Sequence, residues 1–168
     1  MQFYLKTFYT LGGLSTQCLH WVNAYILTYT HMYACKFQAA INAIVNVSNS
    51  DVGFNEMFLV LLGQCYHYIG QYDLALHYLL RSQNRNSYLS EGLMTLASIY
   101  SIENKLDELE KLTMPNISPS EYTAEYWFVL AQHLYCQGKH DKAAYFAQKS
   151  CSLKPKNTEA TLLKGLFI

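Results

Sequence analysis

The sequence predicts an all-α protein that folds as a right-handed solenoid of helical hairpins. Two segments superimpose when the 168-residue chain is shifted by 68 residues, which is twice 34. A weaker copy lies midway between them, so the copies keep a 34-residue phase without insertion. Repeats of this length, with small and turn-forming residues at fixed places, are typical of stacked helical hairpins.

Each hairpin is justified by residues that recur at the same place of the repeat. Small residues stand at the eighth and twentieth places, where two antiparallel helices must approach closely. Glycine or asparagine stands at the fifteenth place, where the left-handed backbone that ends a first helix is favoured. The residues concerned are Gly63, Ala97 and Ala131 at place eight, Gly70, Asn104 and Gly138 at place fifteen, and Ala75 and Ala143 at place twenty.

The phase divides the chain into six segments. We expect an unassigned N-terminal helical segment at 1–20, a degenerate unit at 21–55, full units at 56–89, 90–123 and 124–157, and the first helix of a truncated unit at 158–168. One inserted residue in the turn-rich stretch 46–53 is needed to keep the degenerate unit in phase. A solenoid normally ends in a polar capping helix, whereas the segment 158–168 ends in the apolar residues Leu166 to Ile168. We therefore expect the chain to be a fragment of a longer array.

The second helix of the unit 90–123 is expected to be short. Pro115 and Pro119 follow Leu112 closely, and proline inside a helix removes a hydrogen bond and clashes with the preceding turn. The helix should therefore be cut to about two turns.

Composition excludes several classes of function. The chain has 12 basic and 12 acidic residues, so no basic excess supports binding to nucleic acid. Apolar runs are too short for a membrane span, and five scattered cysteines indicate a reducing compartment. Charge is scarce at 14%, and the second half of the chain holds three times as many charged residues as the first. The first half is therefore expected to be covered by partners or by further repeats.

No catalytic chemistry is indicated by the motifs. Phosphate-binding glycine loops, nucleophile elbows and zinc-protease signatures are absent from the sequence, so we expect neither an enzyme nor a cofactor. His133 and Cys136 are spaced as two metal ligands on one helical face would be, but a complete site needs further ligands. Structural or solvent-facing histidines are the simpler interpretation, and no metal site is predicted.

The 34-residue pattern resembles the tetratricopeptide repeat. This resemblance implies a concave groove lined by the first helix of each unit, which binds an extended peptide or a helix. The candidate groove residues, at places nine, twelve and thirteen, are Gln64, His67, Tyr68, Gln132 and Tyr135. The groove is also expected to be lined at the same places by Ser98, Ser101, Ile102 and Cys136, at place two by Met57, Glu91 and Glu125, and at place five by Val60, Met94 and Phe128.

A second candidate surface lies in the degenerate unit. Tyr25, Tyr29 and Tyr33 are spaced four residues apart and form an aromatic ridge on one face of an uncharged helix. Either this helix is buried in the core, or the ridge is a surface for an obligate partner.

From Glu56 to Gly165 the chain resembles the subunit 7 family of the anaphase-promoting complex, the ubiquitin ligase of mitosis. The residues that carry the resemblance are Lys105 to Leu112, Asn116 to Ser118, Ala124 to Trp127, Ala143 to Tyr145 and Thr161 to Gly165. The resemblance implies a non-catalytic scaffold subunit that forms a homodimer, binds other subunits of the complex and resides in the nucleus and cytoplasm. The alternative is a free adaptor that binds a partner peptide in its groove.

Overall fold

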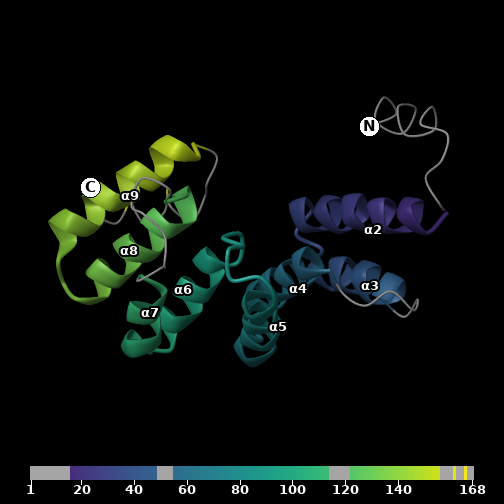
Figure 1. The fold of residues 1–168 in the computed structure, drawn as a ribbon, viewed down its shortest axis with the longest axis horizontal. Helices are drawn as coiled ribbons and strands as arrows, with labels where there is room; N and C mark the ends of the chain where they lie inside the picture. Colours follow the sequence, from purple (N-terminus) through teal and green to yellow (C-terminus); the bar gives the residue numbers. More distant parts are fainter. Residues whose placement is uncertain (1–15, 49–54, 114–121, 156–160, 162–164, 166–168) are drawn as a thin grey trace. The chain divides into compact units, whose positions relative to one another are not determined.

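The computed structural model describes residues 16–48, 55–113 and 122–155, together with the single positions 161 and 165. Eight α-helices lie in this part of the chain, in four successive hairpins (Figure 1). The predicted all-α class is confirmed. The chain divides into two compact units, residues 1–58 and 59–168. The prolines at 115 and 119, most of the stretch 46–53 and most of the segment 158–168 lie outside the described residues.

The first unit contains α2 (Thr16–Tyr33), α3 (Phe37–Ser48) and the first turn of α4 (Glu56–Ile69). Helix α2 begins at Thr16, five residues before the predicted start of the degenerate unit. Its buried face is narrow, with Ala24 and Thr28, and the Thr28 hydroxyl is satisfied by donating to the Ala24 carbonyl at 2.7 Å. On α3, which packs against α2, the buried side chains include Ala40 and Ile44.

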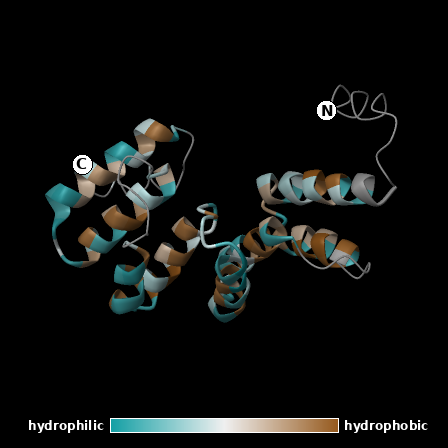
Figure 2. Cartoon of the chain, viewed as in Figure 1, coloured by the Kyte–Doolittle hydropathy of each residue, from teal (hydrophilic) through white to brown (hydrophobic). Residues whose placement is uncertain are grey.

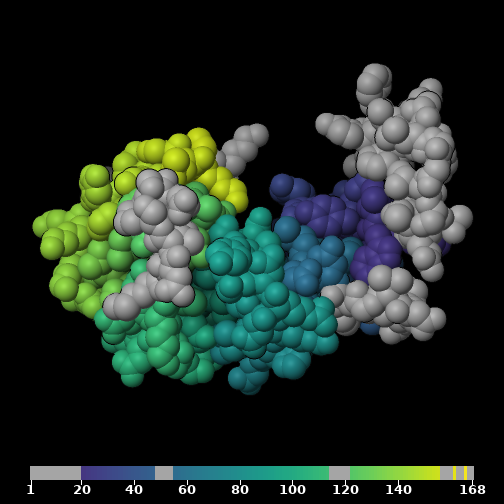
Figure 3. Space-filling model, viewed as in Figure 1, coloured from purple at the N-terminus to yellow at the C-terminus, as the bar shows by residue number. Residues whose placement is uncertain are grey.

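The second unit contains the rest of α4, then α5 (Tyr72–Arg85), α6 (Leu93–Ile102), α7 (Leu106–Leu112), α8 (Ala124–Cys136) and α9 (His140–Leu153). We call the first helix of each hairpin helix A and the second helix B. In this unit helices A are mainly hydrophobic and helices B carry a hydrophilic face (Figure 2). The atoms of α5 to α9 pack continuously on the face in view (Figure 3). One hydrophobic core, with Leu79, Leu96 and Val129 almost fully buried, joins α4 to α9.

The turn between helix A and helix B has the same geometry in all four hairpins. A left-handed residue ends helix A at Cys35, Gly70, Asn104 and Gly138, with φ of 55°, 85°, 56° and 74°. Its N–H donates to the carbonyl three residues back, and the next N–H donates to the carbonyl five residues back, at 2.8 to 3.2 Å. These two bonds define a Schellman motif, which satisfies the carbonyls that a helix end leaves without partners.

The turns predicted at Gly70, Asn104 and Gly138 are confirmed. The turn at Cys35 was not predicted, because cysteine is not a turn-forming residue. It lies 35 residues before Gly70, whereas the later turns are 34 residues apart.

Close packing of each hairpin depends on places eight and twenty. Gly63 of α4 lies against Leu79 and Ala75 of α5, and a Cβ at Gly63 would lie 2.7 Å from Leu79 Cδ2 and 3.2 Å from the Ala75 carbonyl oxygen. Place twenty is alanine at 40, 75 and 143 and is fully buried there. In the third hairpin this place is Leu109, also fully buried, so a larger side chain separates α6 from α7.

Helix α7 has 7 residues, against 14 in α5 and in α9. The short second helix predicted from the two prolines is confirmed.

Candidate protein-binding site

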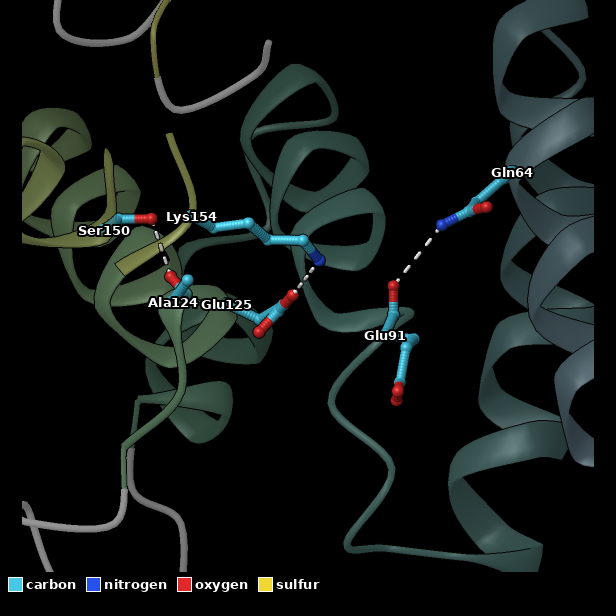
Figure 4. Close-up of polar contacts among 6 residues, drawn as sticks. All are labelled: Gln64, Glu91, Ala124, Glu125, Ser150 and Lys154. Carbon is cyan, nitrogen blue, oxygen red and sulfur yellow. Dashed lines mark hydrogen bonds and ion pairs between the residues drawn. The ribbon is translucent and has the colours of Figure 1, made fainter. Parts of the chain in front are cut away.

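Helices α4, α6 and α8 present polar side chains that connect one hairpin to the next. The Gln64 amide donates from Nε2 to the Glu91 carbonyl oxygen at 3.4 Å, and the Gln132 amide donates from Nε2 to Ser101 Oγ at 2.8 Å (Figure 4 shows the first). Ser101 Oγ also lies 3.2 Å from Cys136 Sγ. Both glutamines occupy place nine and both reach the hairpin between them, so place nine connects successive hairpins.

We call the surface at places nine, twelve and thirteen of α4, α6 and α8 the helix-A face. It carries all five candidate residues predicted from the sequence. Tyr68 is 53% exposed and Ile102 is 57% exposed, whereas Gln64, Gln132 and Tyr135 are half-buried. The face consists of Gln64, His67, Tyr68, Ser98, Ser101, Ile102, Gln132, Tyr135 and Cys136.

The expectation that place five lines the binding surface is wrong. Val60, Met94 and Phe128 are buried at 1%, 7% and 2% exposure and belong to the core of the second unit. The bulky residue at place five is enclosed in the core, so it does not contribute to the helix-A face.

His67 is the titratable candidate on this face. Its ring lies 5.5 Å from the ring of Tyr68 and 5.7 Å from that of Tyr72, and its Nδ1 is buried without a hydrogen-bond partner. Burial lowers the pKa of the imidazole below its ordinary value of 6.5. At neutral pH the ring is therefore uncharged, and it contributes an aromatic surface and not a cation.

The side chains of His133 and Cys136 contact different partners. His133 is buried, and its Nε2 lies 2.7 Å from Gln137 Nε2, whereas Cys136 contacts Ser101 on α6. Within the described residues, no three His, Cys, Asp or Glu side chains come together in an arrangement that could hold a metal ion.

One charged pair borders the helix-A face, at the start of α8. Lys154 Nζ lies 2.7 Å from Glu125 Oε1, and Ser150 Oγ donates to the Ala124 carbonyl at 2.7 Å (Figure 4). Burial alone would raise the pKa of the Glu125 carboxyl, but hydrogen bonds from Lys154, Thr123 and its own backbone lower it overall. Glu125 is therefore ionised and neutralised by Lys154. The Glu91 carboxylate points away from Gln64 in the same view and is exposed.

The tyrosine ridge lies in the first unit and is neither wholly buried nor wholly free. The rings of Tyr25 and Tyr29 are 4.8 Å apart and their hydroxyls are 3.2 Å apart. Tyr25 also packs edge-on against Phe58 at 6.2 Å, whereas Tyr33 is 87% exposed.

The turn at Cys35 gives the ridge its place in the repeat. Counted back from place fifteen, Tyr25, Tyr29 and Tyr33 occupy places five, nine and thirteen. Tyr29 and Tyr33 therefore correspond in register to the helix-A face, whereas Tyr25 corresponds to the enclosed place five. The predicted start of the degenerate unit at residue 21 gives the same places.

The hairpins and their shared turn define a helical-hairpin repeat protein. The tetratricopeptide repeat family matches residues 124–157, which form the hairpin α8–α9. Among solved structures, the crystal structure of MamA is similar, with 25% identity and a TM-score of 0.54 over 84% of this chain and 82% of that one. The family match covers the hairpin α8–α9, and the likeness to MamA extends over most of the chain. A search of curated proteins finds no match.

The comparisons bear on the expected function only at the level of the class. Tetratricopeptide arrays build extended surfaces for binding other proteins. No described helix is both long and apolar enough to cross a membrane. Neither similarity names the anaphase-promoting complex, so membership of that complex rests on the sequence resemblance alone.

Proposed function

We propose that this protein is a non-catalytic interaction scaffold and that its helix-A face binds a segment of a partner protein. The observation that carries the proposal is the row of uncharged hydrogen-bonding groups at Gln64, Ser101 and Gln132, which are half-buried between successive helices A. Amide and hydroxyl groups can pair with the backbone of an extended peptide without the desolvation cost of a charge. Exposed Tyr68 and half-buried Tyr135 supply ring surface beside this row.

The proposal is tested by photo-crosslinking in cells. Benzoylphenylalanine is introduced at Tyr68, and in a separate protein at Tyr145, which is 64% exposed on helix B of the last hairpin. The crosslinker replaces an exposed tyrosine at both positions, so the two proteins differ mainly in which surface carries the crosslinker. We expect a defined crosslinked partner from position 68 and little from position 145. Equal crosslinking from both positions would contradict binding at the helix-A face.

Substitutions then show whether the polar row contributes to the captured complex. Gln132→Ala removes an amide that is proposed to bond the partner's backbone. We expect it to reduce the yield from position 68 about 5-fold or more, since a lost hydrogen bond to the partner costs about 1 kcal/mol. Gln148→Ala, on the exposed side of α9, is the matched control and should leave the yield unchanged.

The finer form of the proposal is a scaffold subunit of the anaphase-promoting complex. It is supported by the resemblance at Lys105 to Leu112 and at Ala124 to Trp127, and it implies other subunits of the complex as partners, a homodimeric full-length protein and a location in nucleus and cytoplasm. Tagged protein should co-purify with ligase subunits from mitotic cells, as identified by mass spectrometry. Recovery with another assembly and without ligase subunits would overturn it.

The alternative form is a free adaptor that binds a partner tail on the same face. It is favoured by the uncharged chemistry of the helix-A face, which suits a peptide backbone. It predicts a monomer in sedimentation experiments, and titratable binding that is weakened by substitution of Gln64, Gln132 or Tyr135 while folding is retained.

A further inference from the structure

Every side chain of the helix-A face is uncharged at neutral pH. The face consists of amides, hydroxyls, phenols, a thiol, an isoleucine and the imidazole of His67. Phenols and thiols ordinarily titrate above neutral pH, and the imidazole is neutral because burial lowers its pKa below the ordinary value of 6.5. The interior of the face therefore offers no fixed charge with which a charged group of a partner could pair.

The carboxylates at place two, on the border of the face, do not supply such a charge. Glu125 is 8% exposed and is neutralised by Lys154, whose Nζ lies at 2.7 Å. Glu91 is exposed, and its carboxylate points away from Gln64 (Figure 4). Because water and salt screen an exposed carboxylate, Glu91 contributes little to the choice of a partner.

The two amides at place nine hold their oxygen atoms ready to accept hydrogen bonds. The Nε2 of Gln64 donates to the Glu91 carbonyl at 3.4 Å, and that of Gln132 donates to Ser101 Oγ at 2.8 Å. Among the described residues, no group donates to Oε1 of either glutamine. The matching partner therefore offers N–H donors, from its backbone or from asparagine and glutamine side chains.

Apolar surface accompanies the amides at place thirteen. Tyr68 of α4 is 53% exposed, and Ile102 of α6 is 57% exposed. Glu103 follows Ile102 directly and is paired with Lys105 at 2.7 Å. Burying Tyr68 and Ile102 against an aliphatic or aromatic group of a partner would remove them from water, which favours association.

A charged side chain of a partner would lose hydration on this face without gaining a counter-charge. Gln64, Ser101 and Gln132 are half-buried, so a group that pairs with them leaves water at least in part. Removing an ion from water without an opposite charge costs far more than removing an amide that finds a hydrogen-bond partner. The face should therefore discriminate against charged segments.

Building on the proposed function of the helix-A face, we propose that this face selects an uncharged segment of a partner protein. The segment presents N–H groups to Oε1 of Gln64 and of Gln132, and it places an aliphatic or aromatic side chain against Tyr68 and Ile102. Acidic and basic side chains of the partner stay outside the contact. A site that grips a carboxylate uses lysine or arginine, and the helix-A face contains neither.

Photo-capture of displayed peptides tests this selection. The full chain with benzoylphenylalanine at Tyr68 is illuminated with a phage library of random dodecapeptides, and the captured phage are sequenced. The chain with the crosslinker at Tyr145 measures non-specific capture. We expect Asp, Glu, Lys and Arg to be about 3-fold rarer among peptides captured at position 68 than in the library.

The outcomes separate this inference from the proposed function. Charged residues at the library frequency, or an enrichment of one sign of charge, would overturn the inference and leave binding at the face intact. Capture at position 68 no greater than at position 145 would overturn the proposed function, and the inference with it. Crosslinking of two copies of the chain in the absence of peptide would show that a second copy covers the face, and it too would overturn the inference.

The salt dependence of binding tests the absence of ion pairs without any substitution in the face. A captured peptide is synthesised with a fluorescent label and titrated with the full chain by anisotropy. We expect its dissociation constant to rise less than about 2-fold between roughly 0.05 and 0.5 M sodium chloride, because no ion pair is screened. A larger rise would show that charge pairing holds the peptide and would overturn the inference.

Two charge variants at one position then locate the discrimination. Gln132→Glu and Gln132→Lys both disturb the contact with Ser101, but they introduce opposite charges. A lysine scan replaces each residue of the captured peptide in turn, and at the contacting positions we expect binding to the wild type to weaken about 10-fold. Gln132→Glu should recover part of this loss and Gln132→Lys should not. The inference is wrong if both variants treat the lysine peptides alike.

Control variants verify that the effect belongs to the face. Gln148→Glu and Gln148→Lys introduce the same charges at an exposed position of α9 and should leave binding of every peptide unchanged. Equal effects at positions 132 and 148 would overturn the inference. Circular dichroism and thermal unfolding verify that each variant is folded.

Discussion

Lys154 and Glu125 form an ion pair that joins the end of the last described hairpin to its beginning. Lys154 Nζ lies 2.7 Å from Glu125 Oε1, and the Glu125 side chain is 8% exposed while that of Lys154 is 58% exposed. The lysine follows α9 directly and the glutamate is in the first turn of α8. The pair therefore fixes the chain just after α9 against the start of the hairpin.

Lys154→Ala should lower the free energy of unfolding by about 1 kcal/mol, because it leaves a buried carboxylate without its cation, while the exposure of Lys154 limits the effect. Urea denaturation at pH 7 measures the difference. Lys142→Ala, exposed on α9, is the control and should change stability by less than about 0.5 kcal/mol.

The same pair should make stability depend on pH. The folded-state pKa of Glu125 is lower than its ordinary value of 4.5, so its contribution is present above pH 4.5 and is lost as the pH falls through the folded pKa. The difference between the wild type and Lys154→Ala should therefore shrink in that acid range. A difference that stays constant from pH 7 to below pH 3 would contradict this account of the pair.

Gly63→Ala should destabilise the second hairpin by about 1–3 kcal/mol, because the new methyl group would lie 2.7 Å from Leu79 Cδ2. Thermal or urea unfolding measures the loss. Leu79→Ala creates space at the same point, so in a double-mutant cycle the glycine substitution should cost less in that background. Additive effects of the two substitutions would show that the methyl group is accommodated elsewhere.

At the left-handed turns, two substitutions should change the free energy of unfolding in opposite directions. Gly138→Ala should destabilise by about 1 kcal/mol through backbone strain alone, because φ is 74° and no atom lies within 4 Å of the added Cβ. Asn104→Gly, at φ 56°, should stabilise by a few tenths of a kcal/mol, since glycine adopts this conformation without strain. Both are measured by thermal unfolding, and a stabilising Gly138→Ala would contradict the turn geometry.

Among the four cysteines whose side chains the structure describes, Cys35 and Cys65 should differ most in reactivity. Burial raises the pKa of the Cys65 thiol to about 11, whereas Cys35 is exposed. Iodoacetamide labelling of the native protein at pH 8, followed by mass spectrometry, should modify Cys35 first and leave Cys65 nearly unmodified. Denatured protein, in which both react, is the control. Early labelling of Cys65 would mean that α4 opens readily.

Much of the fold could be predicted because small residues and turn-forming glycine or asparagine recur at fixed places of the repeat. Gly70, Asn104 and Gly138 mark three turns directly, and the prolines predicted the short α7. The turn at Cys35 escaped prediction because its left-handed backbone is stabilised by two backbone hydrogen bonds, which leave no trace in the identity of the residue.

The candidate sites were less accessible to sequence reasoning. The phase placed Gln64 and Gln132 on helices A, but it could not show that place five is enclosed between neighbouring helices. Contacts between distant segments, such as that of Lys154 with Glu125, produce no periodic pattern in the sequence and so could not be predicted from it.

The turn shared by the four hairpins is closed entirely by main-chain groups. The same two bonds form around cysteine, asparagine and glycine, although glycine adopts the positive φ with the least strain, so the joint between the two helices does not require a particular side chain. A gene segment that encodes one hairpin could therefore be duplicated or deleted in evolution without redesign of this joint. Such duplication allows the number of hairpins in an array to change.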